Sequence, residues 1–209
     1  MKMKKRWFAC AICVVLFIVI LVSILMGREL YIDNLIRNII PNLRFDFCTK
    51  IVKVLTYLGD KYFMVLLVLA ISGILYLKKY KAHAFVSCLN LFNIVILNKG
   101  IKYLVKRERP LDMLIEKDGY SFPSGHSMLS IGVYGLLIYF ICKSNMSKKV
   151  KTLLVTILSI IIVIVGYTRL YLGVHYPSDI FGGYLITAAY LIVFISIIDT
   201  KLFKKVAKK

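Results

Sequence analysis

The chain has 209 residues, a formal net charge of +19, a hydrophobic fraction of 60% and a mean hydropathy of +0.80. Soluble domains are about 45–50% apolar, so this composition excludes an ordinary soluble enzyme and predicts a membrane protein. A nucleic-acid binder would carry its positive charge on a solvated domain. Here the basic residues stand in short runs between long apolar segments. We therefore expect no nucleic-acid partner, and we interpret the basic runs as signals of membrane topology.

The first apolar run, Trp7–Met26, is uncharged and follows the basic segment Met1–Arg6. At about 1.5 Å per residue, a helix of this length crosses the ~30 Å hydrocarbon core of a bilayer. A cleaved signal peptide is the alternative, but the run is longer than a typical signal-peptide core and no A-x-A cleavage site follows it. We expect a first membrane span that is retained.

The segment Gly27–Lys50 mixes apolar residues at helical spacing with charged residues. This pattern is typical of a helix that lies at the membrane interface, here broken at Pro41. An ordinary loop is the alternative, and the sequence favours neither. The charged residues of this segment include Arg28, Asp33, Arg37 and Arg44.

Five more apolar runs follow, at Tyr62–Leu77, Ala84–Leu97, Ser124–Cys142, Thr152–Thr168 and Ile180–Ile198. The stretch Ile51–Leu58 could extend the first of these upstream. Together with the first span, these runs predict an all-α membrane bundle of six transmembrane helices in a single domain, residues 1–209, with an interfacial helix between spans one and two.

Six spans place both ends of the chain on one side of the membrane. Every predicted inner segment contains at least three Lys or Arg residues, and Asp199 is the single acid among them. By the positive-inside rule, both termini are expected to be cytoplasmic in a multi-pass protein of the cell membrane. The loops after spans three and five are then extracytoplasmic. The inner segments are 1–6, 78–81, 143–151 and 199–209.

The first of three polar clusters holds Lys102 and Arg109, the latter followed by Pro110. Lys supplies a point charge for a phosphate and Arg a planar fork. Seven residues are nearly two helical turns, although Pro110 disfavours helix at Arg109. The alternative is a basic cluster against anionic lipid headgroups. We assign that lipid-facing role to Lys106 and Arg107.

The second cluster is Pro123-Ser124-Gly125-His126. Ser124 is a good N-cap, Gly125 allows an oxyanion to approach the backbone, and free N–H groups at a helix start bind anions. His126 can act as an acid or a base near neutral pH. The alternative is a capped helix start with an incidental histidine.

The third cluster is Arg169, His175 and Asp179. His175 and Asp179 are four residues apart, so on a helix the carboxylate reaches an imidazole N–H. Such a pair fixes the tautomer of the imidazole and stabilises the cation that forms on it. The alternative is a structural salt bridge between Arg169 and Asp179.

The three clusters read K-x6-R-P, P-S-G-H and R-x5-H-x3-D in order. This pattern closely resembles the type 2 phosphatidic acid phosphatase family, whose pocket is shared with vanadium haloperoxidases. The one departure is Thr168, where the family usually has Ser, and Thr keeps the hydroxyl group.

The resemblance implies that His175 is the nucleophile and forms a phosphohistidine, oriented by Asp179. It also implies that His126 protonates the leaving oxygen and then activates water. No D-x-D or His-rich ligand set occurs, and we read the Cys10/Cys13 pair in the first span as apolar filler, so we expect no metal and no cofactor. The implied substrate-binding residues are Lys102, Arg109, Ser124, Gly125 and Arg169.

These expectations together describe an integral-membrane lipid phosphatase whose site faces outward and whose partners are its lipid phosphate substrate and membrane lipids. Among the substrates that the resemblance suggests, undecaprenyl pyrophosphate comes first, before phosphatidylglycerophosphate and phosphatidic acid. A lipid phosphotransferase using the same pocket is one alternative. A transporter is another, although the span interiors carry almost no ionisable residues.

The outer loop Leu111–Phe122 mixes apolar and acidic residues. Either it is solvated, or its apolar residues dip into the membrane interface and help to admit a lipid. The residues in question are Leu111, Met113, Leu114 and Ile115.

Overall fold

The computed structural model describes residues 3–28 and 30–199, and the regular structure of these residues is helical, which confirms the predicted all-α class. The residues Met1, Lys2 and the basic tail Lys201–Lys209, which entered the topology prediction, lie outside this description. The helices are α1 Met3–Leu25, α2 Tyr31–Ile39, η1 Ile40–Leu43, α3 Asp46–Leu55, η2 Thr56–Gly59, α4 Lys61–Leu77, α5 Lys81–Val105, α6 Gly125–Lys143, α7 Lys148–Tyr171 and α8 Pro177–Ile198.

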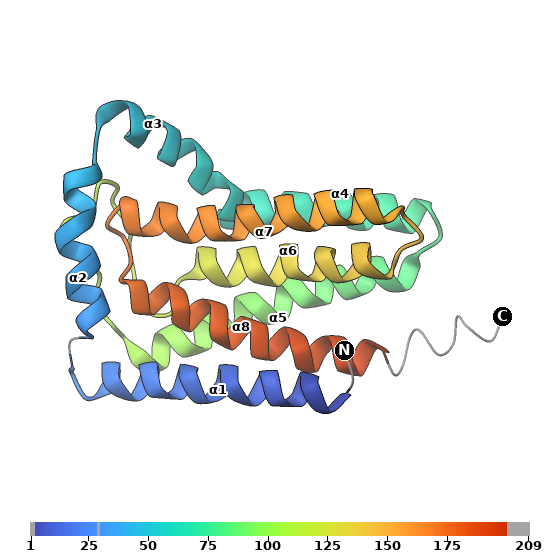
Figure 1. Cartoon of the computed structure of the whole chain (residues 1–209), viewed down its shortest axis with the longest axis horizontal. Coiled ribbons are helices and arrows are strands. Elements are labelled where there is room, and N and C mark those ends of the chain that lie inside the picture. The colour runs from blue at the N-terminus through green and yellow to red at the C-terminus, as the bar shows by residue number, and fades with distance from the viewer. Residues whose placement is uncertain (1–2, 29, 200–209) are drawn as a thin grey trace.

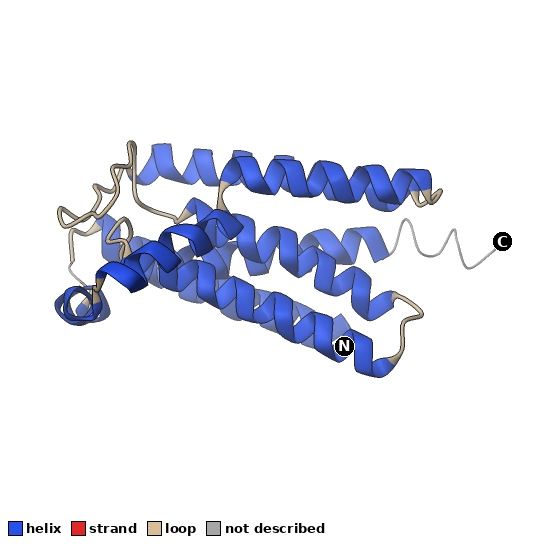
Figure 2. Cartoon of the chain, turned by 90° about the horizontal axis from the view of Figure 1, so that it is seen from above, coloured by secondary structure: helices blue, strands red, loops and turns tan. Residues whose placement is uncertain are grey.

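The long helices run side by side as a bundle, and the short helix α2 lies across one end of it (Figure 1). α6 packs against α5, α7 and α8, while α1 packs along α8 on the outside of the bundle. Seen from above, α3 diverges from the axis of the bundle (Figure 2). The interior where α4, α5 and α6 meet is apolar and includes Met64, Ile94, Met128 and Val133.

Within residues 3–28 and 30–199, five helices, α1, α5, α6, α7 and α8, are long and apolar enough to cross a membrane. α4 has 17 residues and meets this criterion only together with α3 and η2, from which it is bent by 48°. Each predicted apolar run falls inside an observed helix to within one residue, Met26 and Ser124 being the two residues that lie just outside. A count of six spans holds if the bent pair is one span, and it stays a prediction.

The bend between η2 and α4 has local causes. Asp60 caps α4, its carboxylate accepting a hydrogen bond of 2.8 Å from the Tyr62 N–H. Gly59 lies so close to α7 that a Cβ there would clash with Val165. Tyr134 of α6 donates to the Leu58 carbonyl at 2.7 Å. Irregular backbone at membrane depth is tolerated where protein covers it, as it does here.

The segment 27–50 is largely helical, so the loop alternative is wrong for most of it. Around Pro41 the chain forms the 3-10 helix η1, where the sequence predicted a break. The polarity of α2 is the reverse of that in a soluble helix: Tyr31, Leu35 and Ile39 are exposed, whereas Asp33 is only 2% exposed. An exposed apolar face suits the predicted position at a membrane interface.

The two ends of the described chain meet at the end of the bundle opposite α2. Arg6 in α1 forms an ion pair of 2.7 Å with Asp199, directly after α8, and Lys143 lies 3.7 Å from the same carboxylate. The basic segments 78–81 and 143–151 lie at this end too (Figure 1). The three polar clusters therefore lie at one end of the bundle and the basic segments at the other.

Candidate active site

The three polar clusters meet at the α2 end of the bundle. The Ser124 N–H donates to the Asp179 carbonyl at 3.0 Å, which joins the second cluster to the third. The Arg109 guanidinium donates to the Val174 carbonyl at 2.8 Å and lies 3.4 Å from Nε2 of His175, which joins the first cluster to the third. Arg109 and His175, which are 66 positions apart in the chain, thus lie side by side.

The turn between α7 and α8 presents His175 to this site. Gly173 follows the end of α7 with φ +68°, a left-handed conformation that favours glycine. The Val174 N–H donates to the Arg169 carbonyl at 3.2 Å, and the Gly173 N–H donates to the Leu170 carbonyl at 2.9 Å. This pair of hydrogen bonds is a Schellman motif. α8 then begins with a proline, so His175 lies in the short connection between two helices.

His175 and Asp179 are in the predicted arrangement. Nδ1 of His175 lies 3.3 Å from Oδ2 of Asp179, whose side chain is fully buried. The same Oδ2 accepts a hydrogen bond of 2.9 Å from the Tyr176 N–H. A carboxylate on Nδ1 favours the tautomer with its proton there, which leaves the lone pair of Nε2 free.

The surroundings of His175 keep its ring uncharged. Burial lowers the pKa of His175 well below its usual value, and the positive charges of Arg169, Arg109 and Lys102 lower it further. A neutral imidazole can act as a nucleophile, and the same cations would attract an anion to its free nitrogen.

Arg169 is almost completely buried, with 1% of its surface exposed. Its Nη1 donates to Oγ1 of Thr56 in η2 at 2.6 Å, while its Nε has no hydrogen-bond partner among the described residues. The hydroxyl of Thr168, the residue that departs from the family pattern, donates to Oγ1 of Thr56 at 3.2 Å. Thr168 therefore helps to hold the oxygen that accepts from Arg169. A buried guanidinium with an unused donor fits a site for an anion. The alternative salt bridge fails, because Asp179 pairs with Arg107 and His175.

The remaining members of the clusters lie around the same ring. Lys102 donates to the carbonyls of Tyr120 and Ser121, the latter at 3.2 Å, which holds its charge beside the second cluster. His126 lies in the first turn of α6, where its ring packs so close to η2 that a Cβ on Gly59 would lie 3.2 Å from it. Both histidines are therefore at the same end of the bundle.

The start of α6 agrees in part with the prediction made from the sequence. Ser124 is the N-cap, and its hydroxyl accepts from the Ser127 N–H at 3.4 Å. Because the Ser124 N–H already donates to Asp179, an anion could use only its hydroxyl. A Cβ on Gly125 would lie 3.3 Å from Oδ1 of Asn98, so the close approach at this glycine is to a side chain of α5.

The assignment of Arg107 to a lipid-facing cluster is wrong. Its Nη1 donates to Oδ1 of Asp179 at 2.7 Å, and its Nη2 donates to Oδ2 of Asp33 at 2.8 Å. Sequence reasoning also missed Asp33, Thr56 and Asn98. Arg107 adjoins Lys106 in a basic run, and no periodicity in this non-helical stretch separates the buried side chain from the exposed one.

For two apolar residues of the loop 111–122, the hypothesis that they dip into the membrane interface is wrong. Met113 and Ile115 pack against a buried cluster that includes Val52 and Tyr171. Leu111, by contrast, is 95% exposed. The loop is held by the Leu114 N–H, which donates to Leu172 at 2.9 Å. It contains no helix.

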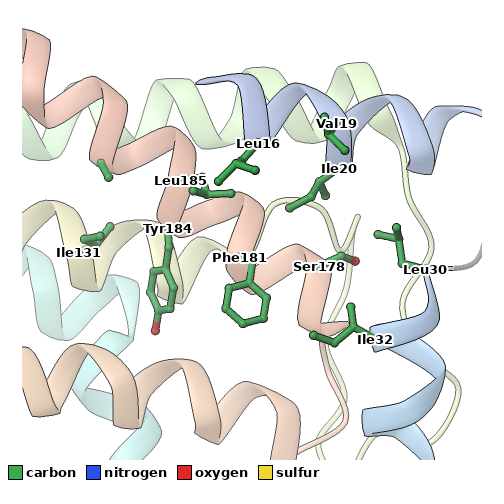
Figure 3. Close-up of a pocket in the computed structure, with 11 residues that line it drawn as sticks. Leu16, Val19, Ile20, Leu30, Ile32, Ile131, Ser178, Phe181, Tyr184 and Leu185 are labelled. Carbon is green, nitrogen blue, oxygen red and sulfur yellow. The ribbon is translucent and has the colours of Figure 1, made fainter. Parts of the chain in front are cut away.

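An apolar groove of about 440 Å³ lies between α1, α2 and α8 (Figure 3). Leu16 and Ile20 of α1 face Phe181 and Leu185 of α8 across it, and Ser178 stands at one end. The hydroxyl of Ser178 contacts Arg107, which contacts Asp179 in turn. These polar side chains therefore lie between the groove and His175.

A family model described as the PAP2 superfamily matches residues 61–203 of this chain. The chain belongs to the PAP2 superfamily. The match covers all three polar clusters, so the resemblance inferred from their residues is confirmed.

Comparisons with individual relatives and with a solved structure agree with this family membership. The phosphatidylglycerophosphatase B of Bacillus subtilis is 30% identical over 154 residues, which cover 73% of this chain and 76% of that protein. An undecaprenyl-diphosphatase of Sulfolobus acidocaldarius is 31% identical over 120 residues, 54% of this chain and 53% of that one. A crystal structure of a transmembrane PAP2-type phosphatidylglycerolphosphate phosphatase from B. subtilis has a TM-score of 0.85 at 24% identity, over 93% of this chain and 98% of that one. The chain thus has the fold of a multi-pass PAP2 membrane protein.

The depressed pKa of His175 predicts a pH-dependent loss of stability. An unfolded histidine takes up a proton near pH 6.5, whereas the buried ring of His175 does so only at lower pH, so stability falls as the pH drops below 6.5. Between pH 7.5 and 5.5 this loss is about 1 kcal/mol. The melting temperature in detergent should fall less for His175→Asn than for the parent over this range. Equal falls in the two proteins would show that the ring of His175 titrates normally.

Proposed function

We propose that this PAP2 protein is a lipid phosphatase that passes a phosphoryl group to Nε2 of His175 and from there to water. The observation that carries the proposal is the geometry of that imidazole. Its Nδ1 faces the Asp179 carboxylate at 3.3 Å, and its Nε2 faces the Arg109 guanidinium at 3.4 Å. This arrangement suits attack by Nε2 on a phosphorus atom whose oxygens are bound by cations.

The reaction would proceed in two displacements. In the first, the Nε2 lone pair of His175 forms a bond to phosphorus, the bond from phosphorus to the lipid oxygen breaks, and His126 gives a proton to that oxygen. In the second, His126 takes a proton from water, the hydroxide attacks phosphorus, and the P–N bond breaks to release inorganic phosphate. Asp179 stabilises the imidazolium that exists between the two steps, as a carboxylate does in the serine-hydrolase triad.

Cationic side chains would supply the charge stabilisation. The positive charges of Arg169, Arg109 and Lys102 lower the pKa of His175, which supports a role for all three in binding the oxygens of the phosphoryl group. The unused Nε of buried Arg169 is suited to an equatorial oxygen, and the hydroxyl of Ser124 and the backbone at Gly125 are suited to another. Phosphoryl transfer depends mainly on positioning and charge, so we propose that the reaction needs no metal ion.

The proposed substrate class is a membrane lipid with a terminal phosphate or pyrophosphate. The names of the two curated relatives specify phosphatidylglycerophosphate and undecaprenyl diphosphate. We propose undecaprenyl pyrophosphate as the first substrate to test, with phosphatidylglycerophosphate and phosphatidic acid beside it. A phosphotransferase would need an acceptor, so release of free phosphate without one separates the two activities.

We also propose that the site lies on the extracytoplasmic side and that both termini are cytoplasmic. The support is the distribution of charge along the bundle. Basic segments gather at the end where Arg6 meets Asp199, opposite the three polar clusters. The positive-inside rule places that basic end in the cytoplasm.

The two histidines should be indispensable for phosphate release. His175→Ala removes the nucleophile and should abolish turnover, while His126→Ala removes a general acid–base group, typically worth ~10²–10⁴ in rate. The measurement is inorganic phosphate released from the purified lipid panel in detergent with EDTA present. The control is His83→Gln at the start of α5, the opposite end of the bundle, which should keep full activity. Either active-site variant retaining most of the activity, or an activity that EDTA abolishes and Mg²⁺ restores, would refute the mechanism.

The orientation can be tested by cysteine labelling in intact cells. Lys117→Cys lies in the loop beside the site and Lys149→Cys in the first turn of α7, at the opposite end of the bundle, and both positions are exposed. A membrane-impermeant maleimide should label the first variant and not the second, after subtraction of the parent signal from native cysteines. The reverse pattern would place the site in the cytoplasm.

A further inference from the structure

Arg107 joins two carboxylates that are both buried. Its Nη1 lies 2.7 Å from Oδ1 of Asp179, and its Nη2 lies 2.8 Å from Oδ2 of Asp33. The two acids belong to α8 and α2 and are far apart in the chain, and their side chains are 0% and 3% exposed. One guanidinium thus serves both acids.

The guanidinium of Arg107 stays protonated in this site. Burial alone would lower the pKa of its guanidinium, but the carboxylates of Asp179 and Asp33 raise the pKa above its ordinary value. A buried carboxylate without a partner is strongly destabilising, so each acid needs this cation. Lys could not replace it, because a single ammonium group lacks the two separate donors of the fork.

Two further contacts fix the plane of the guanidinium. Its Nη1 also donates to Oγ of Ser178 at 2.7 Å. The ring of Tyr176 lies under it, with Cζ 4.0 Å from the ring centroid, which is a cation–π contact. The Ser178 hydroxyl donates in turn to Asp33 at 2.6 Å. A guanidinium held on several sides presents its donors to Asp179 in one direction.

Asp33 caps the first turn of α8 from a different helix. Its Oδ1 accepts from the Ser178 N–H at 2.9 Å, so a carboxylate of α2 lies at the positive end of α8. Asp179 belongs to the same first turn of α8. α2 is therefore attached to the turn that carries the carboxylate facing His175.

We propose that Arg107 and Asp33 are positioning residues that hold the Asp179 carboxylate with its Oδ2 on His175. Arg107 binds the opposite oxygen, Oδ1, so it acts through Asp179 and does not face Nε2. This inference rests on the proposed function, in which Asp179 orients the nucleophile.

The geometry distinguishes Arg107 from its neighbour Arg109. Arg109 faces Nε2, where a phosphoryl group would bind, so its loss should weaken substrate binding. Loss of Arg107 should instead misalign the nucleophile and leave the cations of the phosphate site in place. The expected effect falls on kcat and not on KM.

The test compares Arg107→Lys and Asp33→Asn with the parent protein in phosphate release from the lipid substrate. The value of kcat is divided by the fraction of protein that binds inorganic vanadate, so unfolded molecules do not count. Groups that orient a functional side chain typically contribute about 10–100-fold, and we expect kcat to fall by about this factor for Arg107→Lys and less for Asp33→Asn. KM should change less than about threefold. Exposed Asp46, in the first turn of α3, supplies the matched control Asp46→Asn, which should leave kcat unchanged.

A double-substitution cycle tests whether Arg107 acts through Asp179. In the Asp179→Asn background, Arg107→Lys should lower the residual kcat by less than about threefold, since the group it positions is already altered. An unchanged kcat in both single variants, a rise in KM as the main effect, or full multiplication of the two losses would overturn the inference. Failure of the proposed function appears differently: the unsubstituted protein would release no phosphate, and both proposals would fall.

Discussion

The structure of the site depends on one buried carboxylate. Asp179 accepts hydrogen bonds from the Tyr176 N–H and from Arg107, and it faces Nδ1 of His175. A charge in this position costs several kcal/mol unless it is paired and hydrogen-bonded. Its partners come from the segment after α5 and from the turn before α8, and a further acid on α2 shares the same Arg107. The hydrogen bonds and the ion pair of the Asp179 carboxylate therefore form only when distant parts of the chain assemble in one arrangement.

The membrane explains why these polar groups gather at one end. Long apolar helices leave few positions where charged side chains can meet, and the ends of the bundle are the least costly of them. The 3-10 helix η2, at the break between α3 and α4, is an exception, because it brings the polar side chain of Thr56 into the bundle, where it binds Arg169. Its irregular backbone is covered by α6 and α7, so the break supplies polar groups without exposing them to lipid.

Much of this fold could be predicted from the sequence, because apolar runs and helix boundaries are local signals. The runs at Ala84–Leu97 and Thr152–Thr168 lie inside α5 and α7, and the membership of the PAP2 superfamily followed from three short motifs. Arg107 and Asp33 could not be recognised, because their partners are long-range: Asp33 is 145 positions from Ser178. The roles of the eight residues singled out from the motifs stay predictions, although the structure brings them to the same end of the bundle.

The central claim is that Nε2 of His175 becomes covalently bonded to phosphorus. The most direct measurement is a rapid alkaline quench of the enzyme with a ³²P-labelled lipid phosphate, followed by mass-spectrometric mapping of the labelled peptide. The account predicts a phosphohistidine at position 175 that forms and decays at rates consistent with turnover. Label on another residue, or release of phosphate with no covalent protein species during turnover, would contradict it.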